Sequence, residues 1–440
     1  MVAAETVEAL SEGRLGFFWS DDQWPPELSD DGVERGWLQI DGRTIVLRVL
    51  DESLSFEDPF GRDEPERPSA IVGVLPDDGV LLLDVGWRRG TRVFGGERAS
   101  SAKFDCGAVV GRIEPSTLRS PRLFEVSAKF PAMQAWADMT SMNESRTVDP
   151  SGIVTGWEMT TVAVPTQTAK LGSLTLALDA DWSVRHRDLH SAIENSLRVS
   201  CSAARPRSVR ELVAPIINVQ DLMSLAYGGL VGGTGGSCKP HFDSSNDPRQ
   251  TPSFWHGAVH GESADHLAPP NFKSRALFDL ADLDGVAGLS RWARLCASHY
   301  RAVAPTVMHL RHGPPTAPGL IKDVAGAIEY WVKLHRPAAW ASNRRFVEAF
   351  RTRIDASDFA EWCGNPDAWE TAFWGAYNKL KHDPYYRWDE LELSDLAISG
   401  RLLLTAGLLN RVALSHAPGR RIFAHHRVNH LGRRLRDRYS

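Results

Sequence analysis

Residues 37–50 carry the sequence Trp37-Leu-Gln-Ile-Asp41-Gly42-Arg43-Thr-Ile-Val-Leu-Arg-Val-Leu50. Apolar and polar side chains alternate on both sides of the Asp41-Gly42 pair, which is typical of strands with one buried face. An Asp-Gly pair readily adopts the positive φ angles that a two-residue hairpin turn requires. This stretch therefore predicts a β-hairpin with Asp41 and Gly42 at its turn.

The same pattern continues to about residue 202. Further strands are predicted at Ala70–Leu75, Val80–Val85, Lys103–Cys106, Leu123–Phe130, Glu158–Val164 and Leu174–Leu178. Eight or more short strands at this spacing predict a β-sandwich or a β-barrel. No Gly-rich loop stands between a strand and a helix here, so a Rossmann or P-loop nucleotide site has no support.

A helix is predicted after this β region. Ser208 and Glu211 form a capping box, and the apolar spacing behind them predicts a helix that ends at Gly228-Gly229. Residues 228–270 are rich in Gly, Pro, Ser and Asn. This composition predicts either a linker or a loosely ordered hairpin.

Beyond Phe272 the apolar period becomes helical. Helices are predicted at residues 289–303, 320–334, 344–354, 368–382 and 393–414, which together indicate a four- or five-helix bundle. The predicted fold class is α+β multidomain, in three parts. These parts are a β-rich, sandwich-like domain at 1–205, a connecting helix with a loop-rich insertion at 206–275, and a helical domain with a basic C-terminal tail at 276–440.

The length and amino-acid composition indicate what class of protein this is. The 440 residues suffice for two or three domains, and 42% hydrophobic with 24% charged residues indicates a folded, globular chain. No apolar run approaches the length of a membrane span, so no membrane association is expected. The acidic N-terminus lacks the pattern of a signal peptide, and five widely spaced cysteines indicate reduced thiols. A cytoplasmic protein is the expectation.

The clearest candidate for chemistry is the segment Tyr377-Asn378-Lys-Leu-Lys381-His382-Asp383-Pro384. Asn378, Lys381 and His382 are three or four residues apart and share one helix face. The helix C-terminus favours a cationic His, which suits a proton donor near neutral pH. Spacing alone equally allows His382 to be a helix cap and the lysines to be solvated surface.

These features resemble the HEPN superfamily. The helical bundle, a Glu inside an earlier helix (Ala327-Ile-Glu329-Tyr-Trp331) and the Asn-x-x-Lys-His-Asp-Pro end of a later helix carry the resemblance. The first half is similar to the β-rich N-terminal domain of ApeA-type anti-phage defence proteins, which is followed by a HEPN domain. The segments Gly16–Trp19, Val33–Leu38, Asp41-Gly42 and 124–136 carry that second resemblance.

The resemblance implies metal-independent cleavage of RNA, such as tRNA, without a cofactor, at a homodimer interface. His382 would then be the general acid or base, Asn378 would position the phosphate or the imidazole, and Glu329 would orient polar groups. It further implies abortive anti-phage defence released by a phage-derived trigger.

Tyr377 departs from the HEPN pattern, because the family has an Arg at this place. Arg supplies a permanent charge and a two-pronged contact to phosphate, whereas Tyr supplies one hydroxyl group. Lys379, Lys381 or Arg387 could supply the missing charge. Arg433 and Arg434, in the basic segment 416–440, are further candidates for RNA binding.

Two other classes of function stay open. The first is a degenerate HEPN module that binds RNA or a protein without cleavage. The second is a metalloenzyme that uses Cys238, His241 and Asp243 together with His256 and His260, since thiolate, imidazole and carboxylate suit zinc or iron.

The two ends of the chain differ in charge. Residues 1–68 hold 17 acidic residues and 6 arginines, whereas residues 416–440 hold seven arginines and one Asp. An acidic segment that covers the basic end until a trigger arrives is a hypothesis that follows from this asymmetry.

Overall fold

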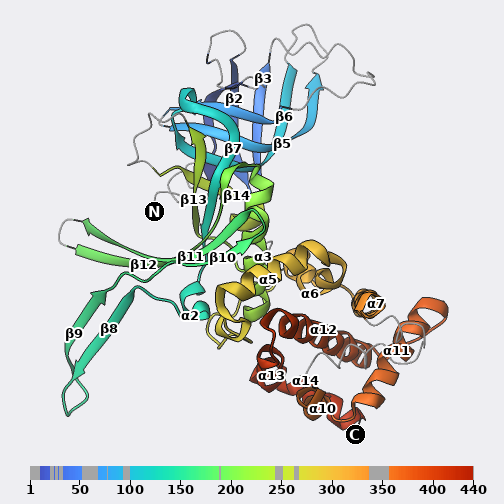
Figure 1. Cartoon of the computed structure of the whole chain (residues 1–440). Helices are drawn as coiled ribbons and strands as arrows, with labels where there is room; N and C mark the ends of the chain where they lie inside the picture. The colour runs from blue at the N-terminus through green and yellow to red at the C-terminus, as the bar shows by residue number, and fades with distance from the viewer. Residues whose placement is uncertain are drawn as a thin grey trace. The chain divides into compact units, whose positions relative to one another are not determined.

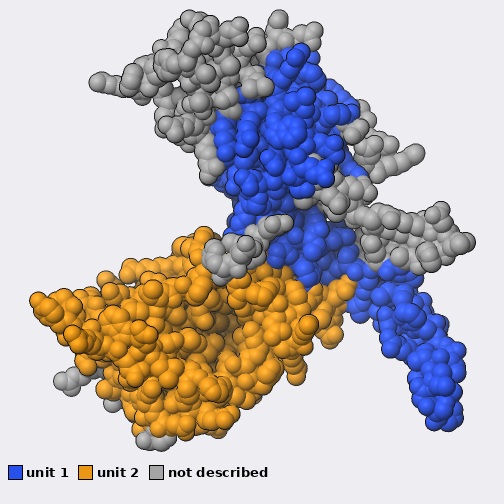
Figure 2. Space-filling model, turned by 180° about the vertical axis from the view of Figure 1, so that it is seen from behind, with its two compact units in different colours: residues 1–131, 140–217, 232–264 blue, residues 132–139, 218–231, 265–440 orange. Residues whose placement is uncertain are grey.

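The computed structural model describes residues 10–19, 24, 28, 33–51, 68–76, 78–92, 100–187, 190–242, 251–261, 267–335 and 356–439 (Figure 1). The chain forms two compact units, coloured separately in Figure 2. Unit 1 comprises residues 1–131, 140–217 and 232–264, and unit 2 comprises residues 132–139, 218–231 and 265–440. The β-rich N-terminal and helical C-terminal composition confirms the predicted α+β class.

Unit 1 begins with six antiparallel strands that close into a barrel. They are β1 (Arg14–Trp19), β2 (Glu34–Asp41), β3 (Thr44–Asp51), β4 (Ala70–Leu75), β5 (Asp78–Arg92) and β6 (Ser100–Ile113). Their neighbour order is β6-β3-β2-β1-β4-β5, and β5 pairs again with β6. Of the two β architectures that the strand spacing predicted, the pairing shows the closed one, which leaves no free edge within these six strands.

The hairpin predicted at residues 37–50 is confirmed as β2 and β3. Asp41 pairs with Thr44, and Gly42 adopts φ +58° at the turn. Leu38 is fully buried whereas Trp37 is 39% exposed, as alternation between core and solvent requires. The core cluster of the barrel draws further buried side chains from every one of its strands, among them Phe18, Leu47, Ile71, Leu82 and Val109.

The sheet continues beyond the barrel. It is extended by β7 (Leu118–Lys129), β10 (Gln167–Leu171), β11 (Leu174–Arg187), β12 (His190–Arg207), β13 (Gly235–Phe242) and β14 (Ser253–His256). A separate hairpin consists of β8 (Met142–Val148) and β9 (Val154–Thr161). The short helices η1 (Pro115–Thr117) and α4 (Gly257–His260) belong to the same unit.

The segment 228–270, for which a linker or a loosely ordered hairpin was predicted, contains two of these strands. β13 pairs along β7, and β14 pairs with β6, so both lie inside the sheet. Pro240 stands where the register between β13 and β7 shifts, which is where a strand tolerates a residue without an N–H group.

The capping box at the start of α3 (Val209–Tyr227) is confirmed. The Ser208 N–H donates to Oε2 of Glu211 at 3.1 Å, and the Glu211 N–H donates to Oγ of Ser208 at 3.4 Å. The helix ends before Gly228, which adopts φ +73°.

Unit 2 is helical. Its elements are α2 (Met133–Ala137), η2 (Ala281–Leu283), α5 (Gly285–Ser298), α6 (Tyr300–His312), α7 (Ala317–His335), α10 (Ala356–Cys363), α11 (Pro366–His382), α12 (Glu390–Ala413), α13 (Ala417–Ala424) and α14 (His426–Tyr439). The single helix predicted at 289–303 is wrong, because the chain breaks at His299 (φ −135°, ψ 40°) between α5 and α6. The helix predicted at 344–354 lies outside the described residues.

α12 is the central helix of this unit and contacts α5, α6, α7, α11, α13 and α14. Within the described part of the chain, it is the one helix long and apolar enough to cross a membrane by length and composition. Most of its apolar stretch is buried inside the protein, so packing within the unit explains its apolar character.

The basic segment 416–440 forms two helices up to Tyr439, α13 and α14. Val428, Leu431 and Leu435 of α14 are buried, and Arg433 between them is exposed. α14 is therefore an amphipathic helix docked on the unit.

Candidate functional site

The candidate site lies at the C-terminal end of α11. Asn365 caps the start of this helix, since its side-chain oxygen accepts hydrogen bonds from the N–H groups of Asp367 and Ala368. The helix ends at His382 because Pro384 disfavours helical geometry in the residue before it, Asp383. The apolar face that includes Trp369 and Phe373 is fully buried and fixes the helix on the unit.

The predicted reactive residues lie on the solvent side of this helix end. Asn378, Lys381 and His382 are all exposed, as is Arg387 just beyond Pro384. A ligand can therefore reach all four side chains. The imidazole stands beside the unpaired carbonyl groups of the helix end.

Tyr377, where the resemblance to HEPN proteins led us to expect an arginine, is a packing residue. Its side chain is buried, and its ring contacts Trp374 edge to face at 5.4 Å between centroids. Its hydroxyl donates to Oε2 of Glu329 in α7 at 3.4 Å. Glu329 thus holds a polar group of the adjacent helix, and both residues link α7 to α11.

Two cations of α11 lie over aromatic rings. Nζ of Lys381 lies 5.4 Å from the centroid of the Tyr377 ring, and Nζ of Lys379 lies 5.3 Å from that of Tyr386. Such contacts are worth about 0.5–1 kcal/mol at exposed sites, so they orient the ammonium groups without withdrawing them from solvent.

The two arginines predicted in α14 differ in their surroundings. Arg433 is exposed. Arg434 forms a two-pronged contact with Asp395 of α12, with Nε 3.0 Å from Oδ2 and Nη2 2.5 Å from Oδ1. The Asp395 side chain is only 2% exposed, so Arg434 neutralises a buried carboxylate.

Comparison with known families identifies the family of the chain. The family model described as ApeA N-terminal domain 1 matches residues 13–292, which is more than half of the chain. The chain belongs to the ApeA N-terminal domain 1 family. Membership of this family indicates anti-phage defence as the broad role. Neither the curated proteins nor the solved structures contain a match to this chain.

The ApeA match includes the 238–260 region, where a metal site was an alternative. His241 Nδ1 is 2.9 Å from Oγ of Ser120, and Nδ1 of His260 accepts a hydrogen bond from the His256 N–H at 3.0 Å. Cys238 is buried, which raises the pKa of its thiol. Within the described ranges, no three His, Cys, Asp or Glu side chains gather closely enough to hold a metal ion, and Asp243 lies outside those ranges.

The basic segment 416–440 places two arginines close to two histidines in the run Arg420-Arg421-Ile-Phe-Ala-His425-His426. Arg421 pairs with Asp279 at 2.5 Å and with Asp282 at 2.6 Å, and the buried His425 lies with Nε2 3.1 Å from the carbonyl oxygen of Arg275. These contacts connect α13 to the η2 region. The side chains of Arg421 and His425 are therefore both engaged within the unit.

Sequence reasoning missed Arg401 and His309, which line a pocket of unit 2. One signal was present: Arg401 is the one charged residue between Asp395 and Arg411 in α12. A lone cation within an apolar helix stretch either pairs in the core or faces a cavity.

Proposed function

We propose that this ApeA-family protein is a cytoplasmic, abortive anti-phage defence factor whose helical unit cleaves cellular RNA, such as tRNA, without a metal ion. The observation that supports this proposal is the exposed His382 at the C-terminal end of α11, beside the exposed Asn378 and Lys381. Proton transfer by a positioned side chain typically contributes about 10²–10⁴-fold to a rate.

In this proposal His382 takes the proton of a ribose 2′-OH or gives one to the leaving 5′-oxygen. The 2′-oxygen forms a bond to phosphorus, and the bond from phosphorus to the 5′-oxygen breaks. Lys379, Lys381 and Arg387 supply positive charge for the phosphate, in place of the arginine that Tyr377 replaces. A homodimer brings two such helix ends together, and a phage-derived trigger releases the activity.

The test is cleavage of total cellular RNA in the presence of EDTA by the purified chain and by His382→Ala. His416→Ala is the matched control, because His416 is also an exposed histidine of the helical unit. We expect the native chain and the control to cleave, and His382→Ala to lose at least about 100-fold in rate. Equal cleavage by all three proteins would refute the role of His382.

The burial of Tyr377 favours a second candidate, a module that binds RNA without cleaving it. The side chain at the place of the catalytic arginine is engaged with Glu329 and Trp374 and carries no charge. In this case Lys379 and Lys381 bind phosphate groups, and affinity falls as the salt concentration rises.

RNA binding at several salt concentrations distinguishes this second candidate. Lys381→Gln should weaken binding and reduce the salt dependence, whereas Lys322→Gln, an exposed lysine of α7, should change neither. If the chain binds RNA but does not cleave it, either with or without its trigger, the function is RNA binding without cleavage.

A further inference from the structure

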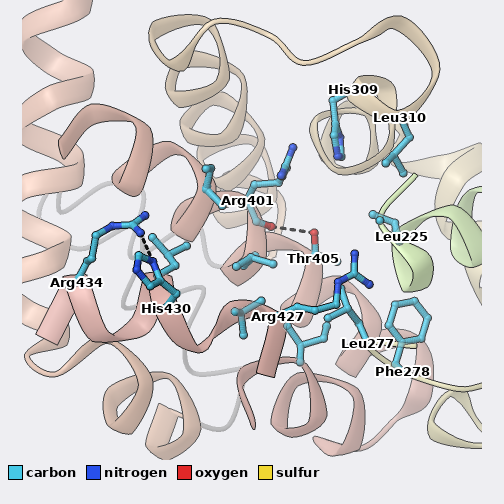
Figure 3. A pocket seen from close by; sticks show the side chains of 16 residues that line it. Leu225, Leu277, Phe278, His309, Leu310, Arg401, Thr405, Arg427, His430 and Arg434 are labelled. Atoms are coloured by element: carbon cyan, nitrogen blue, oxygen red, sulfur yellow. Dashed lines mark hydrogen bonds between the residues drawn. The ribbon is translucent and has the colours of Figure 1, made fainter. Parts of the chain in front are cut away.

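The helical unit contains an open pocket of about 420 Å³ that is separate from the α11 helix end. It is lined from the end of α3, from the segment before η2, and from α6, α12, α13 and α14 (Figure 3). Small-molecule sites in proteins typically span about 300–1,000 Å³, so this volume suits a ligand of modest size.

The lining combines apolar and cationic side chains. The larger apolar ones are those of Leu225, Leu277, Phe278, Leu310, Leu402 and Leu431. Arg401, Arg427 and Arg434 reach the same pocket from α12 and α14 (Figure 3). None of the 16 described residues that line it is Asp or Glu. Arg434 is neutralised by Asp395 behind the wall, so the positive charge of the pocket comes from Arg401 and Arg427.

Arg401 is the central group of this pocket. Among the residues that the structure describes, no carboxylate pairs with its guanidinium group. Its side chain keeps some accessible surface toward the pocket, yet the surrounding protein lowers its pKa to about 10, so it remains a cation at neutral pH. A desolvated cation without a partner is costly, and an anionic ligand would remove that cost.

His309 of α6 provides a second unsatisfied group. Its Nδ1 atom is buried and has no hydrogen-bond partner within the described chain. Burial and the nearby Arg401 lower its pKa to about 3, so the ring is neutral at neutral pH and can donate or accept a hydrogen bond. Buried polar atoms are paired as a rule, so this unpaired nitrogen is an energetic cost in the wall of the pocket.

Arg427 is held in place by the end of α3. Its Nη2 atom donates to the carbonyl oxygen of Tyr227 at 3.1 Å, and its Nη1 atom donates to that of Ala226 at 3.4 Å. Gly228 makes this approach possible, because a Cβ atom there would collide with the guanidinium group. Arg427 therefore adds a fixed positive charge to the wall.

We propose that this pocket binds a free nucleoside monophosphate, with the phosphate against Arg401 and the base against the apolar wall. The guanidinium fork matches phosphate oxygens in a two-pronged contact. The partly exposed apolar side chains of Leu277, Ile398 and Leu402 provide surface for the face of a base. The site is distinct from the α11 helix end, so this proposal does not rest on ribonuclease activity.

Binding to the full chain is measured by calorimetry and by thermal unfolding with four probes: AMP, UMP, inorganic phosphate and adenosine. We expect AMP or UMP to bind and to raise the Tm, phosphate to bind more weakly, and adenosine to have no effect. Absence of binding by both nucleotides at millimolar concentration would overturn the proposal. A 5′-phosphorylated RNA that binds more tightly than AMP through Arg401 would also overturn it, because the ligand would then be an RNA end.

The decisive variant is Arg401→Met, with Arg411→Gln, an exposed arginine of the same helix, as the matched control. We expect Arg401→Met to weaken nucleotide binding roughly 10- to 100-fold, the loss typical of one charged hydrogen-bond partner. Its Tm without ligand should rise, because an unpaired cation has left the interior. A lower Tm with unchanged nucleotide binding would show that Arg401 serves packing alone and would overturn the proposal.

Discussion

Gly400 stands where α12 passes close to its neighbours. A Cβ atom at this position would lie 2.6 Å from Cε2 of Phe373 in α11 and 3.3 Å from Cγ1 of Val324 in α7. Phe373 is fully buried and cannot turn away. The absence of a side chain at Gly400 therefore fixes how closely α12 and α11 approach, and with it the position of the helix that carries His382.

Gly400→Ala should destabilise the helical unit relative to Gly375→Ala. Both substitutions gain about 1 kcal/mol of helix propensity. Gly375 of α11 has open space where an alanine methyl group would stand, whereas Gly400 does not, and overpacking costs about 1–3 kcal/mol. Urea unfolding should show this difference of about 1–3 kcal/mol between the two variants; equal free energies of unfolding would refute the packing argument.

At the scale of elements, Asp395 and Arg434 join α12 to α14. Arg434→Gln should lower the free energy of unfolding by about 2–4 kcal/mol, because it leaves a buried carboxylate with Arg438 alone, 3.9 Å away. Arg433→Gln, at the exposed neighbouring position, should cost less than about 0.5 kcal/mol. Chemical denaturation of both variants checks this, and equal losses would contradict it.

The variants Arg433→Gln and Arg434→Gln also distinguish an effect on RNA binding from an effect on stability. An RNA-binding role for α14 predicts that Arg433→Gln weakens binding at unchanged Tm. A loss seen only in Arg434→Gln, and restored at lower temperature, would instead follow from partial unfolding.

The β8–β9 hairpin contributes little to the stability of unit 1. Its large apolar side chains are exposed, with Ile153 at 63% and Trp157 at 62%, and Figure 2 shows it as a narrow blue arm. At its base, the Val162 N–H donates to the carbonyl oxygen of Ser141 at 2.8 Å, and Oγ of Ser141 donates to Asn195 at 2.8 Å.

Replacement of residues 142–161 by a short Gly-Ser linker should therefore change the Tm of unit 1 by less than about 2 °C. An isolated two-stranded hairpin is only marginally stable, so its loss removes few buried contacts. Calorimetry of the full chain measures the effect. A large drop would mean that the hairpin supports the sheet through contacts beyond its base.

The sequence allowed a correct prediction where a turn or a helix cap depends only on residues that are close together along the chain. The Asp41-Gly42 turn and the Ser208–Glu211 capping box depend on neighbouring residues, and both are confirmed. β13 and β14 were not predicted as sheet strands, because Gly235, Gly236 and Pro240 break strand patterns and only pairing with β7 and β6 overrides them. The contact between Tyr377 and Glu329 joins residues 48 positions apart, which spacing along one helix cannot reveal.

In the whole molecule, each unit contains a partly buried histidine whose protonation the surrounding protein disfavours. In unit 1, burial lowers the pKa of His260 to about 4, and in unit 2, burial and Arg401 lower that of His309 to about 3. Much of the acidic N-terminal segment lies outside the described residues, so the hypothesis that it covers the basic end stays a prediction. His260 and His309, in contrast, are described residues of unit 1 and of unit 2, respectively.

Both units should lose stability as the pH falls below about 6.5, the ordinary pKa of an unfolded histidine. Between that pH and the lowered pKa the unfolded chain binds a proton that the native state refuses, so the free energy of unfolding falls by up to about 1.4 kcal/mol per pH unit for each histidine. The stability that each neutral histidine contributes is fully present above pH 6.5. At pH 5 the free energy of unfolding should be lower by about 2 kcal/mol for each histidine.

Calorimetry between pH 7.5 and 5 should show this acid destabilisation, and His309→Asn should reduce the slope for unit 2 alone. Asn keeps a polar group of similar size but cannot be protonated in this range. His260→Asn should do the same for unit 1, whereas His416→Asn, at an exposed position, serves as the control. An unchanged slope in His309→Asn would show that other groups, and not this buried imidazole beside Arg401, set the acid limit of the helical unit.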